Sequence, residues 1–351
     1  ALPPEVLLRL DPEVGRQAEA IYRAQGPVFT MPTRDLPGFG LAQLEAAPWE
    51  RDLTRRRGVS FRYGIADGHA HRDTLSYEFA ALGRKFIGGS AYFGGGWSPL
   101  HQRMQNAVEV DGEELTVQTA GASASGSGYL HALDALPGLT YVDGEAKKAS
   151  YPVDTYRRFV ALVDVGPTDS YVFDVFRVAG GGKVHTFCMH STALGPYSFN
   201  TEMRKLDPAR EEDKADLDYL RWFPNFPDTK QKGVTPETLE TIWSVKKGTR
   251  GATEDYLLRS TLYGAPKQKL LACVAQRSDR LQDPILFAFV QNRPADGNST
   301  FLQLLEAYQG KPIVETREVL SVTREGKPVP DAAAARIRTS AGRTDLIAYV
   351  V

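Results

Sequence analysis

Two histidines and an aspartate alternate in the segment Gly68 to Ser76, which reads G-H-A-H-R-D-T-L-S. Residues i and i+2 of an extended strand point to the same face, so His69, His71 and Asp73 are predicted to share one side of a sheet. Three such side chains are costly to desolvate unless a metal, a substrate or one another satisfies them. A solvated strand face is the alternative for an isolated H-x-H pair. The turn-like run before the segment and the apolar strand after it favour a site.

Short strands separated by turns are predicted to position these side chains. From Val28 to Val351, runs of β-branched and aromatic residues alternate with Gly, Pro, Asp and Asn. Three of these runs, at 159–165, 171–178 and 184–190, are joined by short loops, which indicates an antiparallel meander. The pattern as a whole predicts an all-β fold, an antiparallel multi-stranded β-sandwich.

Three regions are predicted along the chain. Residues 1–27 form a short helical tail that links to a missing N-terminal region, with Asp11 as the helix cap and Gly26 at its end. A large β-sandwich follows over residues 28–265, and residues 266–351 form a smaller terminal β-sheet region. Because the chain opens on alanine rather than methionine, we expect a processed or incomplete product.

The composition excludes several classes of protein. The 351 residues carry a net charge of -1, with 42 basic and 43 acidic side chains, so no global field recruits nucleic acid. No apolar stretch approaches the roughly 20 residues of a membrane span, and no signal peptide is visible. Cys188 and Cys273 are the only cysteines, which excludes a disulfide-rich scaffold and a four-cysteine zinc site. Buried free thiols are the expected state of both, with one disulfide as the alternative.

The motif and its surroundings resemble the heparinase II/III-like polysaccharide lyases. The likeness covers most of the chain from Leu36 onward, and the order of the matching blocks makes it specific. The blocks are L-P-G-F-G-L-A at 36–42, the G-H-x-H-x-D-x-L-S core, N-A-V-E-V-D-G at 106–112, Y-V-F-D-V-F-R-V at 171–178 with Gly180 to Gly182 and His185, and Ser299-Thr300-Phe301 with 308–312.

This resemblance implies the C-terminal β-sandwich region of a bacterial lyase that is periplasmic or secreted. Such an enzyme cleaves a uronic-acid-containing polysaccharide, such as a glycosaminoglycan, by β-elimination. A base removes the proton beside the carboxylate, and an acid helps the glycosidic oxygen leave. The resemblance also implies a partner, an N-terminal α/α-toroid of the same protein or of another chain, which supplies a tyrosine. The chain alone is therefore expected to hold half an active site.

Residue by residue, the family motif assigns three roles. His69 takes the place of the catalytic histidine, His71 that of a zinc ligand, and Asp73 that of an orienting carboxylate. The family's second zinc ligand is an aspartate, where this chain has Gly89, and its third is the histidine of an H-N-T motif, where this chain has Gln105. Since zinc needs three or four N, S or O ligands, this shell is incomplete and no cofactor is expected.

His101, four residues before Gln105, is the candidate substitute ligand, with a surface histidine as the commoner alternative. Tyr92 and Trp97 lie in a glycine-rich stretch and are candidates for a sugar-stacking platform, although core filling is the commoner use of aromatic residues.

The remaining histidines are predicted to be structural. His185 and His190 have an odd separation on one strand, so they face opposite sides and serve as local hydrogen-bonding residues. His131 has no partner that the sequence reveals.

Three functions stay open on the sequence, and the third is a subunit of a larger assembly whose sandwich mediates protein contacts. The His69 to Asp73 core favours a lyase that needs its toroid, whereas the incomplete zinc shell favours a non-catalytic carbohydrate-binding or structural β-sandwich subunit.

Overall fold

A computed structural model describes most of the chain and contains mainly antiparallel sheets. The described residues are 11–25, 32–48, 50, 52, 54–64, 73–88, 102–113, 128–146, 151–193, 195–221, 223, 229–248, 252–264, 266–276, 284–329 and 332–350. Every pairing between described strands is antiparallel, as predicted for an all-β sandwich. No helix within the described residues is long and apolar enough to cross a membrane.

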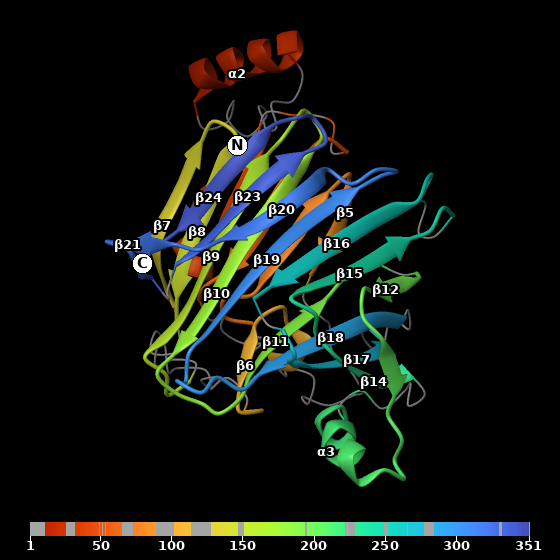
Figure 1. Ribbon diagram of the computed structural model, residues 1–351. Helices are drawn as coiled ribbons and strands as arrows, with labels where there is room; N and C mark the ends of the chain where they lie inside the picture. The colour runs from red at the N-terminus through yellow and green to blue at the C-terminus, as the bar shows by residue number, and fades with distance from the viewer. Residues whose placement is uncertain are drawn as a thin grey trace.

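The eight-stranded sheet is the middle layer of the molecule (Figure 1). Its strands, in spatial order, are β12 (Tyr197–Phe199), β15 (Thr238–Val245), β16 (Tyr256–Tyr263), β19 (Ser299–Tyr308), β10 (Ser170–Ala179), β9 (Thr155–Asp164), β8 (Leu139–Glu145) and β7 (Tyr129–Leu136). Nine of the ten residues of β10 are buried, because other sheets cover both faces of this layer. A strand covered on both faces is expected to read as the nearly continuous apolar run that the sequence shows here.

Two sheets cover one face of this layer. The five-stranded sheet consists of β1 (Arg34–Leu36), β2 (Leu41–Ala46), β3 (Arg57–Arg62), β4 (Tyr77–Ala81) and β5 (Arg84–Ile87). The six-stranded sheet consists of β13 (Met203–Lys205), β14 (Gln231–Val234), β17 (Lys269–Gln276), β18 (Pro284–Asn292), β11 (His185–His190) and β6 (Val108–Val110). Together they enclose the main apolar core, to which Phe61, Phe176 and Phe187 belong.

A three-stranded sheet covers the opposite face of the middle layer. Its strands are β20 (Val314–Leu320), β23 (Ala333–Thr339) and β24 (Thr344–Tyr349), and a small hairpin of β21 (Thr323–Arg324) and β22 (Lys327–Pro328) extends from it. The ring of Tyr349 stacks on Phe159 in a second apolar core, with centroids 4.6 Å apart.

Pairing after residue 265 bears on the predicted domain boundary. The strands β17 and β18 pair within the six-stranded sheet, and β19 pairs between β10 and β16. Residue 266 is the predicted start of the smaller sheet region, whereas the separate three-stranded sheet begins at Val314. The residues next to a strand in the sequence do not show which sheet the strand joins. Each strand pairs with the partner that completes its buried face.

The predicted meander is correct for two of its three strands. The strands β9 and β10 pair directly, but β11 leaves them and joins β18 and β6 in the opposite sheet. The loop between β10 and β11 has Gly180 at φ 80° and Gly182 at φ 82°, a region that glycine adopts without strain. A Cβ at Gly180 would lie 1.9 Å from a carboxylate oxygen of Asp154. The glycines therefore allow the chain to cross between layers.

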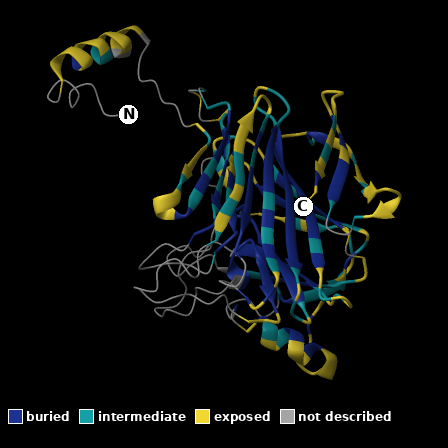
Figure 2. Ribbon diagram, turned by 90° about the vertical axis from the view of Figure 1, so that its left-hand side faces the viewer, coloured by how far each residue is buried: buried dark blue, intermediate teal, exposed yellow. Residues whose placement is uncertain are grey.

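The helix α2 (Pro12–Gln25) matches the predicted N-terminal helix. The Asp11 carboxylate accepts hydrogen bonds from the amides of Glu13 and Val14 at 3.0 and 3.2 Å, which is the expected cap. In Figure 2, α2 lies apart from the sheets, and both Val14 and Ile21 on it are exposed.

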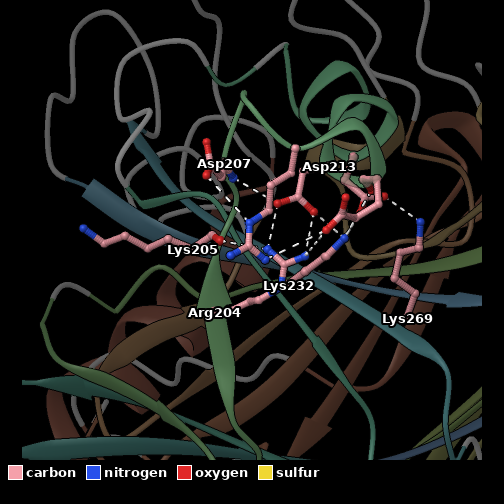
Figure 3. A network of polar contacts seen from close by, with 9 residues as sticks. Arg204, Lys205, Asp207, Asp213, Lys232 and Lys269 are labelled. Carbon is pink, nitrogen blue, oxygen red and sulfur yellow. Dashed lines mark hydrogen bonds and ion pairs between the residues drawn. The ribbon is translucent and has the colours of Figure 1, made fainter.

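A second helix, α3 (Glu211–Tyr219), lies against the six-stranded sheet through a network of ion pairs (Figure 3). Arg204 donates two hydrogen bonds to Asp213 at 2.7 and 2.8 Å, and Lys269 contacts Asp216 at 2.6 Å. The charges in this segment thus attach a helix to a sheet. Beside it, Phe223 packs on Phe287 in a third apolar cluster, which also contains the buried free thiols of Cys188 and Cys273.

Candidate functional site

The second half of the sequence motif forms a tight turn at the end of β3. Leu75 donates its amide to the Arg62 carbonyl at 2.7 Å, Ser76 donates to the Asp73 carbonyl at 2.8 Å, and the Arg62 amide donates to Ser76 at 2.9 Å. Leu75 has φ 60°, which costs a branched residue about 1 to 2 kcal/mol. Asp73 therefore lies before a turn rather than within an extended strand, because β4 begins only at Tyr77.

A buried arginine holds this turn in place. Arg158, on β9, donates to the Leu75 carbonyl at 2.7 Å and to the Asn106 carbonyl, and it makes a two-pronged pair with Asp174 at 2.8 and 2.7 Å. Arg158 and Asp174 are each 1% exposed at the side chain. The guanidinium also lies over the Tyr77 ring, 4.4 Å from its centroid. This pair therefore joins the turn to the middle layer.

Tyr77 does not have the properties of a catalytic base. Its hydroxyl lies 3.3 Å from Asp174, and its side chain is buried beneath the turn. Burial, together with the Asp174 charge, raises the pKa of Tyr77 well above 10, so its phenol stays protonated. A tyrosine base for this site would come from elsewhere.

Above the turn, a pocket of 200 Å³ opens on the face of the five-stranded sheet that points away from the core. We call this face the outer face, and this pocket the Asp73 pocket. Its lining residues are Leu41, Ser60, Arg62, Asp73, Ser76, Tyr77, Glu78 and Gln105. Polar side chains from three chain segments thus converge at the end of β3.

The Asp73 pocket holds a partly exposed ion pair. Nε of Arg62 lies 2.9 Å from the Asp73 carboxylate, and the two side chains are 29% and 22% exposed. Burial raises the pKa of Asp73 to about 6, and the Arg62 charge offsets only part of this rise. Near neutral pH, the pocket therefore contains a carboxylate that can exchange a proton.

The segment with Gln105 reaches the same pocket from a distant part of the sequence. The short helix η2 (Gln102–Met104) precedes it, and Gln105 is buried at the edge of the pocket. Asn106 accepts a hydrogen bond from the His190 amide at 2.8 Å and another from Arg158 through its carbonyl. The structure thus brings Asp73 and Gln105 together.

The other predicted site residues lie outside the described part of the chain. They are His69, His71, Gly89, Tyr92, Trp97 and His101. His69 and His71 lie between the described residues Gly64 and Asp73 in the sequence. Gly89 follows directly after the described residue Gly88.

Within the described residues, nothing suits a zinc ion. No group of three or more His, Cys, Asp or Glu side chains could hold a metal there. Of the two departures from the family's ligand set, only Gln105 is described, and a carboxamide is a poor zinc ligand. Asp73, beside it, is already neutralised by Arg62.

Three further histidines make local contacts. His185 lies 2.8 Å from the Ser299 hydroxyl and 2.7 Å from the Gly181 carbonyl, while His190 lies 2.7 Å from the Gly88 carbonyl. The prediction that these two histidines hydrogen-bond locally is confirmed. His131 does have a partner that the sequence did not reveal, the Glu145 carboxylate at 2.7 Å.

Sequence reasoning missed Arg62, Arg158 and Asp174. Arg62 could have been found, because Gly58, Ser60 and Arg62 alternate with the buried Val59 and Phe61 and end next to the motif. The pairing of Arg158 with Asp174 carries no such signal, since the two residues lie 16 positions apart on different strands.

Comparisons with known proteins show similarity of fold. No protein family model matches the chain, and no curated protein matches it. Heparan sulfate lyase HepC from Pedobacter heparinus matches 99% of this chain with a TM-score of 0.57 and 12% identity. A heparinase III structure matches 93% of it with a TM-score of 0.54 and 11% identity. The chain covers 47% and 43% of those chains, so it spans just under half their length. The predicted heparinase-like β-sheet region is thereby confirmed as a fold.

Proposed function

We propose that this chain is the β-sandwich part of a polysaccharide lyase that acts on a uronic-acid-containing polysaccharide. The observation that supports this most is the heparan sulfate lyase-like fold over 99% of the chain. In this fold, the end of the G-H-x-H-x-D-x-L-S motif lies at a polar pocket. Fold alone does not define an activity, so the pocket carries the chemical part of the proposal.

The reaction is a β-elimination. A base removes the proton from the carbon beside the uronate carboxylate, the electron pair forms a double bond, and the bond to the neighbouring glycosidic oxygen breaks. An acid gives that oxygen a proton. The carbon acid is weak, so the developing negative charge on the carboxylate needs a nearby cation or hydrogen-bond donors.

The described pocket residues and the site residues predicted from the sequence share the roles in this scheme. Arg62 supplies the cation for the substrate carboxylate, which replaces Asp73 as its partner, and Asp73 orients the groups beside it. His69, which precedes Asp73 by four residues, transfers the proton. Tyr92 and Trp97 supply aromatic faces for sugar rings.

The other half of the cleft belongs to a helical region outside this chain, in the same protein or in a partner chain. The chain covers less than half of the lyases that it matches, which leaves room for such a region. We place the assembled protein in the periplasm or outside the cell, where its polymer substrates occur.

A second function is a non-catalytic carbohydrate-binding sandwich. The observation that favours it is Gln105, which lines the pocket and stands where the resemblance to the lyases implies a histidine ligand. The chain would bind a polysaccharide without cleaving it if the site has lost its catalytic groups but retains the side chains that contact the sugar.

Elimination creates an unsaturated uronate that absorbs in the near ultraviolet, so one assay separates the two functions. We expect no absorbance change when this chain alone meets heparan sulfate, hyaluronan or alginate. The longer protein with its helical region should give a steady rise with at least one of them. Turnover by the isolated chain would contradict the shared cleft, and an inactive longer protein would favour the binding function.

A further inference from the structure

A second hollow lies on the outer face of the five-stranded sheet, next to the Asp73 pocket. It encloses 380 Å³, which is within the range of about 300 to 1,000 Å³ for small-molecule sites. We call it the Glu45 hollow. Its lining residues are Gln43, Glu45, Arg56, Arg57, Gly58, Ser60, Glu78, Ala80, Ala81, Gly83, Arg84 and Lys85.

Small residues in the middle strands create the hollow. Gly58 on β3 and Ala80 on β4 are cross-strand partners, so no long side chain rises from the centre. Glu45 flanks this pair on one side, and Lys85 flanks it on the other. The intervening residues of these strands, such as Val59, point into the core. The sheet therefore presents a floor with raised walls.

The hollow and the Asp73 pocket form one continuous groove. Ser60 and Glu78 are cross-strand partners and line both. Along β3, the groove passes from Gly58 through Ser60 to Arg62. Four residues of strand span about 13 Å at 3.3 Å each, which is longer than one sugar ring. An extended polymer in the Asp73 pocket would thus continue over the hollow.

Hydrogen bonds on the floor orient Glu45 as an acceptor. The Ser60 hydroxyl donates to the side-chain oxygen of Gln43 at 2.5 Å. The side-chain NH2 group of Gln43 donates to the Glu45 carboxylate at 3.0 Å. Arg56 lies 3.4 Å from the same carboxylate, a long contact. A carboxylate has about four acceptor positions, and the Glu45 side chain is 7% exposed, so a hydroxyl donor can reach its remaining positions only from within the hollow that it lines. Sugars carry such donors on every ring.

The walls favour a negatively charged ligand. Among the lining residues, four are basic and two are acidic, but the buried Arg57 is neutralised by Asp164 outside the hollow, so the attraction rests on the other three. Lys85 pairs with Glu78 at 2.7 Å, but these side chains are 45% and 42% exposed, and an exposed pair of this kind contributes little to stability. A carboxylate or sulfate of a ligand can therefore take the place of Glu78 beside Lys85.

We propose that the groove from the Glu45 hollow to the Asp73 pocket binds successive units of an acidic polysaccharide. Glu45 accepts hydrogen bonds from ring hydroxyls, and Lys85 pairs with an acidic group of the same or the next unit. The ligand class in this inference rests on the proposed function. The Glu45 hollow would bind units of the polymer that lie at a distance from the bond that is cleaved.

Ala80→Trp tests the groove, because Ala80 is exposed on the floor and a large side chain there fills the hollow without entering the core. Ala348→Trp is the matched control, an exposed alanine on β24 of the three-stranded sheet. Calorimetric titration of this chain with heparan sulfate, hyaluronan and alginate oligosaccharides measures binding without turnover. We expect Ala80→Trp to raise the Kd of the bound saccharide about tenfold or more and Ala348→Trp to leave it unchanged.

Glu45→Gln provides an independent test, since it keeps the shape of the side chain and removes its charge. Loss of one hydrogen bond to a charged group corresponds to about a tenfold rise in Kd. An unchanged Kd in both Ala80→Trp and Glu45→Gln, or a wild-type chain that binds none of the three saccharides, overturns the proposal. Groove-dependent binding by a protein that never catalyses elimination would refute the lyase proposal and leave the groove standing.

Discussion

Two arginine–aspartate pairs flank the same turn, and they differ in burial. Arg158 and Asp174 are 1% exposed and share two short hydrogen bonds, whereas Arg62 and Asp73 are 29% and 22% exposed and share one contact of 2.9 Å. The buried pair also binds the Leu75 carbonyl. The same two residue types thus serve as a rigid support in one place and as an exchangeable pair in the other.

The buried pair should give the largest change in stability. Arg158→Met leaves Asp174 charged and without its partner in the core, so we expect a loss of about 3 to 5 kcal/mol in the free energy of unfolding. Chemical denaturation measures this loss. Adding Asp174→Leu should recover most of it, because the double variant buries no lone charge.

Arg62→Met is the comparison for that variant. A partly exposed pair contributes about 0 to 1 kcal/mol, so its removal should barely shift the denaturation midpoint. Equal losses in Arg158→Met and Arg62→Met would show that the two pairs do not differ in the way described.

The pH dependence of stability should involve a smaller change in the free energy of unfolding than Arg158→Met does, and it should identify the partly exposed pair. The pKa of Asp73 is raised from 3.8 to about 6 in the folded chain, so its protonated form favours folding. The stability that this group contributes is complete below pH 3.8 and is lost as the pH rises through 6. Asp73→Asn removes this dependence. Relative to wild type, the variant should gain up to about 3 kcal/mol between pH 4 and pH 8.

Asp255 provides a control of opposite sign. Its carboxylate accepts hydrogen bonds from Lys246 and from the Lys247 amide, which lower its pKa. Its contribution is therefore present at neutral pH and is lost as the pH falls. If the stability difference from wild type changes with pH in the same direction for Asp73→Asn as for Asp255→Asn, the pKa of Asp73 is not raised in the folded chain.

The sequence predicted the sheet architecture because the period of two is local and repeats from Val28 onward. It did not predict that β11 leaves its neighbours, since the choice of sheet depends on which faces remain uncovered. The turn at Leu75 also departed from the expected strand. A leucine with positive φ has no sequence signal, and the carbonyl contact from Arg158, distant in the chain, holds it there.

The order of the motif blocks along the chain allowed part of the candidate site to be predicted from the sequence. The G-H-x-H-x-D-x-L-S block and the Gln105-Asn106 block are separate in sequence, and the structure places Asp73 and Gln105 at one pocket. No sequence motif predicted the Glu45 hollow. It depends on the absence of side chains at Gly58 and Ala80, which is visible only after the strands are in register.

The central proposal is that the motif beside the partly exposed pair takes part in elimination, and His69→Ala in the longer protein tests it most directly. The rate of unsaturated uronate formation should fall by roughly a hundredfold or more, the typical loss when a positioned acid or base is removed. His131→Ala, which removes a histidine bonded to Glu145 on another sheet, should leave the rate unchanged. An active longer protein in which His69→Ala and His131→Ala turn over equally fast would contradict the account.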